Sequence, residues 1–186
     1  MFIQTEPTPN PATLKFIPGK TVLGDGTVDF RDKSEATASP LAQRLFDVDG
    51  VAGVFLGSDF ISVTKNDADE WQHIKPAILG AIMEHYMSGA PTVDAGETPG
   101  EEVAGDYDAK DEDTVKTIKE LLDTRVRPAV ANDGGDIVFQ GFKDGVVFLH
   151  MRGACSGCPS STATLRHGIE NLLKHFCPDV QEVRPI

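Results

Sequence analysis

The first half of the chain alternates between apolar and polar positions in a pattern typical of short strands joined by turns. Residues 12–18 alternate with the period of two that a half-buried strand requires, and 27–30 form a second short extended run. Two further β-rich runs, 51–55 and 60–64, lie on either side of a Gly-Ser-Asp turn that begins at Gly57, which predicts a hairpin.

Two helices are predicted in the same half. Ser39 followed by Pro40 is a typical helix start, because serine caps the first free N–H groups and proline fits the first helical position. Apolar residues then recur every three or four positions from Trp71 to Tyr86, which predicts an amphipathic helix that ends near Gly89. Residues 1–92 are therefore predicted to form one compact α+β domain.

The second half has a different and more regular order. Asp113 can cap a helix that ends before Pro128, and an Asp-Gly turn at Gly145 predicts a hairpin. The predicted elements are, in chain order, a helix over 113–127, strands over 137–139 and 146–151, a helix over 159–176 and a strand over 180–183. This α-β-β-α-β order predicts a small sheet covered by helices on one face.

The charge distribution separates the two halves. The chain has 186 residues and a net charge of −12. Residues 96–113 alone contribute −7, from eight acidic and one basic side chain, and they contain few large apolar residues. Such a segment buries too little surface to offset the entropy of ordering it. The organisation predicted is a domain over 1–92, an acidic flexible linker over 93–112 and a second domain over 113–186.

Bulk properties exclude several classes of protein. The negative charge disfavours binding to nucleic acid and to anionic membranes, and no apolar run approaches the ~20 residues that span a bilayer. The first residues resemble neither a signal peptide nor an Arg-rich transit sequence. We therefore expect a cytoplasmic protein of bacterial type, with a mature mitochondrial protein as the alternative. In such a setting a CxxC pair is more often metal-binding or redox-active than a structural disulfide.

Cys155 and Cys158 form that CxxC pair, between a β-rich run and a helix that starts at Pro159. Cys158, the second cysteine, is predicted to lie at or beside the helix N-cap. The free N–H groups and the dipole of a helix N-terminus stabilise negative charge, so this placement predicts a lowered thiol pKa. Gly157, between the two cysteines, allows the backbone to approach whatever the sulfurs bind. The motif fits a dithiol redox site, half of a zinc site or half of an iron–sulfur site.

The number of cysteines limits these choices. Structural zinc and iron–sulfur clusters usually take four ligands, whereas the chain has three cysteines, and the third, Cys177, follows the predicted helix. Its neighbours predict a small buried residue rather than a ligand. One subunit therefore cannot supply four sulfurs, but two subunits that meet on a two-fold axis could supply two each.

Two separate motifs resemble a known family. Residues 133–136 (Asp-Gly-Gly-Asp), followed by 153–161 (Gly-Ala-Cys-Ser-Gly-Cys-Pro-Ser-Ser), are similar to the NifU C-terminal domain of Nfu-type iron–sulfur cluster carriers. The opening residues 2–16 are similar to the Nfu N-terminal domain. The resemblance covers nearly the whole chain outside the linker, and the two motifs occur in the expected order.

The resemblance implies a carrier rather than an enzyme. Cys155 and Cys158 would ligate a 4Fe–4S cluster, or alternatively a 2Fe–2S cluster, between two subunits and pass it to apo-proteins. The implied partners are a second copy, recipient apo-proteins and an upstream assembly scaffold, with no nucleic acid and no membrane. Gly153, Ser156 and Gly157 would shape the loop, while 133–135 would either support it or form a simple turn. The first domain and the linker would serve partner recognition and reach.

Two other functions fit the CxxC motif. The first is a thioredoxin-like oxidoreductase with Cys155 as nucleophile and Cys158 as resolving thiol. Against it, the preceding strand pairs through a hairpin, and no tryptophan precedes the pair, since the only one is Trp71. The second is a structural dimer in which paired CxxC motifs hold Zn²⁺.

Overall fold

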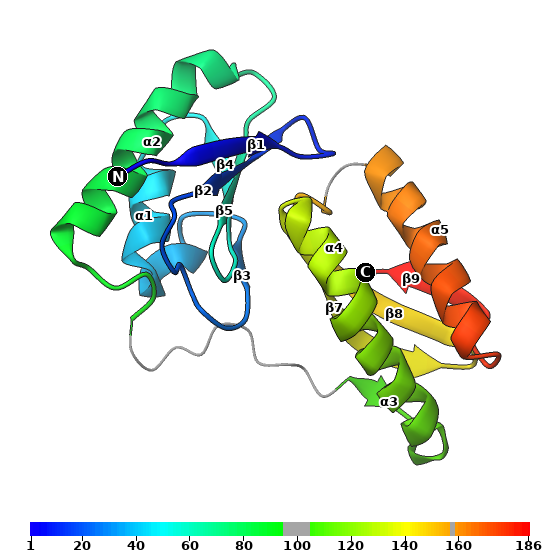
Figure 1. Ribbon diagram of the computed structural model, residues 1–186. Helices are drawn as coiled ribbons and strands as arrows, with labels where there is room; N and C mark the ends of the chain where they lie inside the picture. The colour runs from blue at the N-terminus through cyan, green and yellow to red at the C-terminus, as the bar shows by residue number, and fades with distance from the viewer. Residues whose placement is uncertain (95–104, 157–158) are drawn as a thin grey trace. The chain divides into compact units, whose positions relative to one another are not determined.

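A computed structural model of the chain describes residues 1–94, 105–156 and 159–186, without the side chains of 159–161. The chain divides into two compact units, Met1–Gly100 and Glu101–Ile186, each with its own sheet and helices (Figure 1). The fold is therefore α+β, as predicted. The predicted domain boundaries, 1–92, 93–112 and 113–186, stay a prediction.

The first unit is built on a five-stranded sheet of order β1-β2-β5-β4-β3, in which every neighbouring pair is antiparallel. The strands are β1 (Gln4–Pro7), β2 (Thr13–Ile17), β3 (Val28–Phe30), β4 (Val51–Leu56) and β5 (Ile61–Lys65). The predicted hairpin is confirmed as β4 and β5. Strand β1 was not predicted from the sequence, because its four residues alternate little in hydropathy.

The helices of this unit begin and end where the sequence predicts. In α1 (Pro40–Phe46), the Ala42 N–H donates to the Ser39 hydroxyl at 3.1 Å, and a short 3₁₀ turn, η1 (Glu35–Ala38), precedes it. Helix α2 (Trp71–Ser88) ends at Gly89, whose φ of 70° is the left-handed conformation common at helix ends. Its buried side includes Ile74, Ile78 and Ile82, which close the core against the sheet.

The second unit contains a four-stranded sheet of order β6-β7-β8-β9. Its strands are β6 (Asp106–Tyr107), β7 (Gly135–Lys143), β8 (Val146–Gly153) and β9 (Glu182–Pro185). The predicted hairpin is confirmed as β7 and β8, with positive φ at Asp144 and Gly145 as a tight two-residue turn requires. Strand β9 runs parallel to β8, and β6 runs parallel to β7.

One helix prediction was wrong. The helix does not end before Pro128: α3 (Glu112–Leu121) continues through a π-helical turn, η3 (Leu122–Val126), into α4 (Arg127–Asn132), and Figure 1 shows one nearly continuous column. The Arg127 N–H bonds to the Leu122 carbonyl five residues back, so the bonding register has already shifted. Pro128 then lies in the first turn of α4, where its missing N–H costs little.

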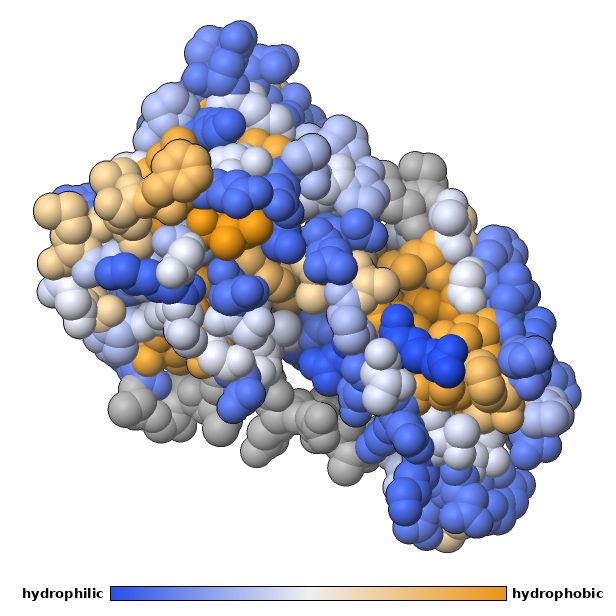
Figure 2. Space-filling view, in the orientation of Figure 1, coloured by the Kyte–Doolittle hydropathy of each residue, from blue (hydrophilic) through white to orange (hydrophobic). Residues whose placement is uncertain are grey.

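The helices cover one face of this sheet. In β8, Val147, Leu149, Met151 and Gly153 are buried and alternate with less buried residues, which is the pattern of a strand with one covered face. Helix α5 (Pro159–Phe176) spans the residues predicted for it. Apolar side chains gather on the second unit between α4 and α5 in the space-filling view (Figure 2).

Part of the predicted linker is ordered within the second unit. Residues 106–107 form β6, and 109–111 form a 3₁₀ turn, η2 (Ala109–Asp111), whereas 95–104 lie outside the described residues. Among the described residues, no helix combines the length and apolarity that crossing a membrane requires.

Candidate functional site

Cys155 lies in the short connection between β8 and α5, as the sequence predicts. The strand ends at Gly153, whose φ of 63° reverses the chain direction just before the cysteine. The Cys155 residue is only 6% exposed. Gly157 and Cys158, the last two positions of the motif, lie outside the described residues.

Hydrogen bonds tie this connection to the elements around it. The Ala154 N–H donates to the Gly134 carbonyl at 3.2 Å, which joins the connection to the start of β7. The Ser156 hydroxyl donates to the Gly153 carbonyl at 2.8 Å. The Thr162 hydroxyl of α5 donates to the Cys155 carbonyl at 3.1 Å. Cys155 is therefore held at the N-terminal end of α5 from both sides.

Gly135 packs directly against the Cys155 sulfur. A Cβ atom added at Gly135 would lie 2.6 Å from Sγ of Cys155 and 2.8 Å from the Arg152 carbonyl oxygen. Real Cβ atoms do not approach that closely, so no side chain fits at this position. The adjacent Gly134 has a φ of 80°, which also favours glycine. The two glycines do more than turn the chain, because Gly135 forms one wall of the cysteine site.

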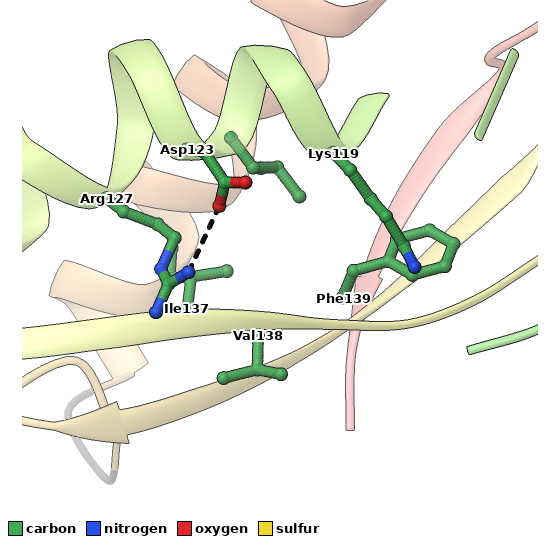
Figure 3. A pocket seen from close by; sticks show the side chains of 7 residues that line it. Lys119, Asp123, Arg127, Ile137, Val138 and Phe139 are labelled. Atoms are coloured by element: carbon green, nitrogen blue, oxygen red, sulfur yellow. Dashed lines mark hydrogen bonds and ion pairs between the residues drawn. The ribbon is translucent and has the colours of Figure 1, made fainter. Parts of the chain in front are cut away.

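An ion pair with a buried carboxylate lies next to this wall in the sequence. Asp136, the residue after Gly135, is 3% exposed and accepts hydrogen bonds from Nε and Nη2 of Arg127 at 2.9 and 3.1 Å. The Ile137 N–H donates to the same carboxylate at 2.8 Å. Arg127 also donates to Asp123 at 3.0 Å (Figure 3). The hydrogen bonds from Arg127 to Asp136 raise the pKa of the guanidinium, which remains charged.

Sequence reasoning missed this pair. Asp136 had no predicted role, and Arg127 was not singled out. The two residues are nine positions apart, a spacing that neither a helix nor a strand produces, so no local pattern points to the contact. An aspartate directly before the apolar run of β7 was the one available signal, since a charge at the start of a buried strand needs a partner.

Cys155 does not share the lowered thiol pKa that the sequence predicts for Cys158. Burial, together with the nearby carboxylates of Asp133 and Asp136, raises the pKa of this thiol from 9.0 to about 12. The protonated thiol is therefore the form present near neutral pH, and metal binding at this sulfur would release a proton. A buried, protonated thiol is also a poor nucleophile. The prediction stays untested for Cys158.

Cys177 is a core residue, as predicted. It is 5% exposed within the apolar cluster of the second unit, and its N–H donates to the Leu173 carbonyl at 2.7 Å. It follows the last residue of α5, whereas Thr162 contacts Cys155 at the other end. Fifteen helical residues at 1.5 Å each put roughly 22 Å between the two ends. Cys177 therefore cannot bind the same metal group as Cys155 within one subunit.

The described residues contain no group of three or more His, Cys, Asp or Glu side chains arranged to hold a metal ion.

One argument against a dithiol oxidoreductase needs correction. Strand β8 pairs with β7 through a hairpin, as predicted, but it also pairs in parallel with β9 across α5. A strand–helix–strand crossover therefore does contain the CxxC motif. The raised pKa of Cys155 and the lack of a preceding tryptophan still disfavour that enzyme.

Two family models match the two units. Residues 3–89 match the model described as "Scaffold protein Nfu/NifU N terminal", and residues 118–184 match the model described as "NifU-like domain". The two matched ranges lie in the first and the second unit respectively.

Curated relatives match across the whole chain. The chain is 49% identical over 187 residues to the human "NFU1 iron-sulfur cluster scaffold homolog, mitochondrial", covering all of this chain and 72% of the relative. It is 50% identical over 188 residues to the protein of the same name from Drosophila sechellia, of which it spans 65%. A solution structure of a NifU-like protein from Saccharomyces cerevisiae matches with 27% identity and a TM-score of 0.47. It covers 52% of this chain and 87% of the yeast chain.

The expectation of a cytoplasmic protein is wrong. The curated relatives that match the whole chain are named as mitochondrial. The expectation depended on the first residues of the sequence, which carry no information about compartment in a chain that spans about two thirds of those relatives.

Proposed function

Because the chain belongs to the family of Nfu-type iron–sulfur cluster scaffold proteins, we propose that it binds an iron–sulfur cluster as cargo and passes it to apo-proteins. Cys155 and Cys158 of one copy, with the same pair of a second copy, supply the four thiolates. The cluster is of the 4Fe–4S type, with 2Fe–2S as the alternative. The protein acts as a carrier and not as a catalyst.

The position of the cysteines carries this proposal. Cys155 lies at the N-terminal end of α5 and shares one CxxC motif with Cys158. Cys177, in contrast, is buried in the core at the far end of that helix. Since iron–sulfur clusters are usually held by four thiolates, one subunit has two suitable sulfurs and lacks the other two. A second copy supplies them with the same geometry.

Delivery follows from the way the cluster is shared. Each copy holds the cluster through two sulfurs only, so the thiolates of a recipient protein can displace them one at a time. The second copy, an upstream scaffold that supplies the cluster and the recipient apo-proteins are the partners. A mitochondrial setting, as in the named relatives, is proposed for these exchanges. The first unit contributes to recognition of recipients rather than to cluster binding.

Anaerobic reconstitution of the full chain with iron and sulfide tests the proposal. The expected product is a brown dimer with about four irons per dimer, measured by visible absorption, iron and sulfide analysis and light scattering. Cys155→Ala and Cys158→Ala should each abolish the colour. Cys177→Ala is the matched control and should keep it, because that thiol lies in the core.

Other outcomes distinguish the two alternatives. A colourless dimer that contains zinc and is lost in both CxxC variants would replace the carrier by a structural zinc site. A colourless monomer that reduces the disulfides of insulin would replace it by a dithiol oxidoreductase.

A further inference from the structure

Helix α2 of the first unit has an exposed face with few charges. Within this helix, which the structure describes in full, Glu84 is the only exposed Lys, Arg, Asp or Glu. A helix with one face on the core usually presents charged side chains to water. The other exposed positions between residues 76 and 87 are apolar or glycine, namely Pro76, Ala77, Gly80, Met83 and Met87. Met87 is 83% exposed.

Helix α3 of the second unit shows the usual pattern instead. Its exposed positions are Glu112, Asp113, Lys116, Thr117 and Glu120, four of which are charged. Each of the two helices buries an apolar side of its own, so they differ in the side that faces away from the core. Apolar side chains gather on the first unit where α2 and the N-terminus lie (Figure 2). An exposed apolar surface of this kind marks a site of interaction with another molecule.

Gly80 lies at the centre of this face. A Cβ added there would meet nothing within 4 Å, so packing inside the unit does not require a glycine at this position. Glycine in the middle of a helix also weakens it relative to alanine. A position without a side chain does, however, let a second helix approach closely, to an axis separation of about 8 Å. The face is therefore suited to packing against another helix.

The exposed positions are symmetric about Gly80. Residues three, four and seven positions after it are exposed, and so are residues three, four and seven positions before it. A second copy of α2 that lies antiparallel across a two-fold axis at Gly80 therefore meets the same positions in reverse order. Met83 of one copy then lies against Pro76 of the other, and Met87 against His73. Each flexible methionine packs against a more rigid side chain, to which it can adapt.

The polar side chains of the face are complementary in the same arrangement. Glu84 of one copy lies about one turn from His73 of the other, on the same side of the contact. An imidazole N–H of His73 can donate to the Glu84 carboxylate. The ion pair of Glu84 with Arg44 at 3.5 Å within one copy is compatible with this, because a carboxylate accepts several hydrogen bonds. Symmetry and charge therefore both favour a second copy of this chain as the occupant.

We propose that α2 is a self-association surface, through which two copies of the chain pair as antiparallel helices that cross at Gly80. A single helix face buries less than the roughly 800 Å² per partner of a standard interface, so the pairing is weak, with a Kd of about 10⁻⁴ M. Paired copies bring two CxxC motifs to a high local concentration, a consequence that rests on the proposed function. The pairing itself requires no cluster, so the two proposals can fail separately.

Sedimentation velocity of the iron-free full chain, in reductant and at about 0.01 to 1 mM, tests the proposal. The sedimentation coefficient should rise from that of a monomer towards that of a dimer. Gly80→Glu should weaken pairing at least about tenfold, because it places two carboxylates together on the two-fold axis. Gly168→Glu is the matched control, since Gly168 also lies within a helix with open space around it. It should leave the pairing unchanged.

Disulfide formation tests the register of the two helices. In a chain with Cys155 and Cys158 replaced by serine, Gly80→Cys adds a thiol on the two-fold axis. Helix axes about 8–10 Å apart leave roughly 4–5 Å between the two Cα atoms at this position, which a disulfide can span. Gln72→Cys is the control, because this exposed position of the same helix lies roughly 24 Å from its copy in the antiparallel pair. Non-reducing electrophoresis after incubation in a glutathione buffer should show a dimer for Gly80→Cys only.

Three results would overturn the proposal. The first is a chain that stays monomeric at every concentration, which would leave the face to a different protein. The second is an equal loss of pairing in Gly168→Glu and Gly80→Glu. The third is cross-linking of Gln72→Cys as fast as that of Gly80→Cys. Failed cluster reconstitution in a chain that still pairs would instead overturn the proposed function alone.

Discussion

One buried ionisable side chain in each unit, His85 in the first and Asp136 in the second, shows two different environments. In the first unit, His85 of α2 is buried, and neither ring nitrogen has a hydrogen-bond partner among the described residues. In the second unit, Asp136 of β7 is equally buried, but its carboxylate accepts hydrogen bonds from Arg127 and from the Ile137 N–H. A neutral imidazole can be buried in this way at modest cost, whereas an unpaired carboxylate cannot.

Glycine positions show the same contrast. Gly80 lies within α2, and a Cβ added there would meet nothing within 4 Å. Gly135 lies between Asp136 and the Cys155 sulfur, and an added Cβ would meet both Sγ and a carbonyl oxygen at less than 3 Å. A close-packed glycine and a buried carboxylate therefore lie next to the candidate ligand Cys155. At Gly80 of the first unit, by contrast, there is room for a side chain.

Gly135→Ala should have the largest effect. The new methyl group collides with backbone and sulfur atoms that cannot both move, so the second unit should lose about 3 kcal/mol of unfolding free energy or more. Chemical denaturation followed by circular dichroism measures this, and cluster reconstitution should fail in parallel. Gly168→Ala is the matched control, because Gly168 lies in α5 with open space around it. It should stabilise the unit by about 0.5–1 kcal/mol.

If Gly135→Ala kept both its stability and its ability to bind a cluster, the close contact between Gly135 and Cys155 would have no structural consequence. The contrast with Gly80 would then disappear as well.

Asp136→Asn should have the next largest effect. It leaves Arg127 half-buried without its main anionic partner, and the cost of breaking a buried pair, reduced by the partial exposure of Arg127, is about 2–3 kcal/mol. Asp123→Asn is the matched control, since Asp123 pairs with the same guanidinium but is 53% exposed. It should cost only about 0.3–0.5 kcal/mol. Urea denaturation of the three proteins side by side measures the difference.

Equal losses in the two aspartate variants would show that burial does not distinguish the two carboxylates. The stabilising effect of Asp136 would then have to come from the hydrogen bond that its carboxylate accepts from the Ile137 N–H.

Most of the fold could be predicted because local chemistry marks it. Ser39 and Gly89 mark the ends of helices, and the Asp-Gly pair at Gly145 marks a hairpin, through the conformations that those residues favour. The π-helical turn could not be predicted in this way. Pro128 signals that one hydrogen bond is missing, but not whether the helix ends or shifts its register, and the packing of Val126 and Val130 into the core decides that.

The site was predictable only in part, for a related reason. The CxxC spacing and the helix that follows it are local and could be read from the sequence. The raised pKa of the Cys155 thiol could not be predicted, because it results from burial and from the carboxylates of Asp133 and Asp136, which belong to another part of the chain. The contact from Gly135 to Sγ and the pair of Arg127 with Asp136 both join segments distant in sequence, and no periodicity reveals them.

His85 offers the smallest but most selective test of the comparison. Burial, helped by the nearby charge of Arg44, lowers the pKa of this imidazole below its ordinary value of 6.5. The folded unit therefore holds a neutral ring, while the unfolded chain takes up a proton more readily. The contribution of the neutral His85 ring to the unfolding free energy of the first unit is therefore fully present above pH 6.5. It is lost as the pH falls through the lowered pKa of the folded state.

His85→Leu should remove that loss at acid pH and leave the first unit as stable at pH 7.5, because a partnerless imidazole is exchanged for an apolar side chain of similar size. His73→Leu is the matched control, because His73 lies on the same helix but is exposed. Denaturation midpoints of the three proteins at pH 7.5 and 5 provide the measurement. A loss at acid pH that persists in His85→Leu would place the sensitive group elsewhere, and the contrast between the unpartnered His85 and the fully bonded Asp136 would then carry no energetic difference between the units.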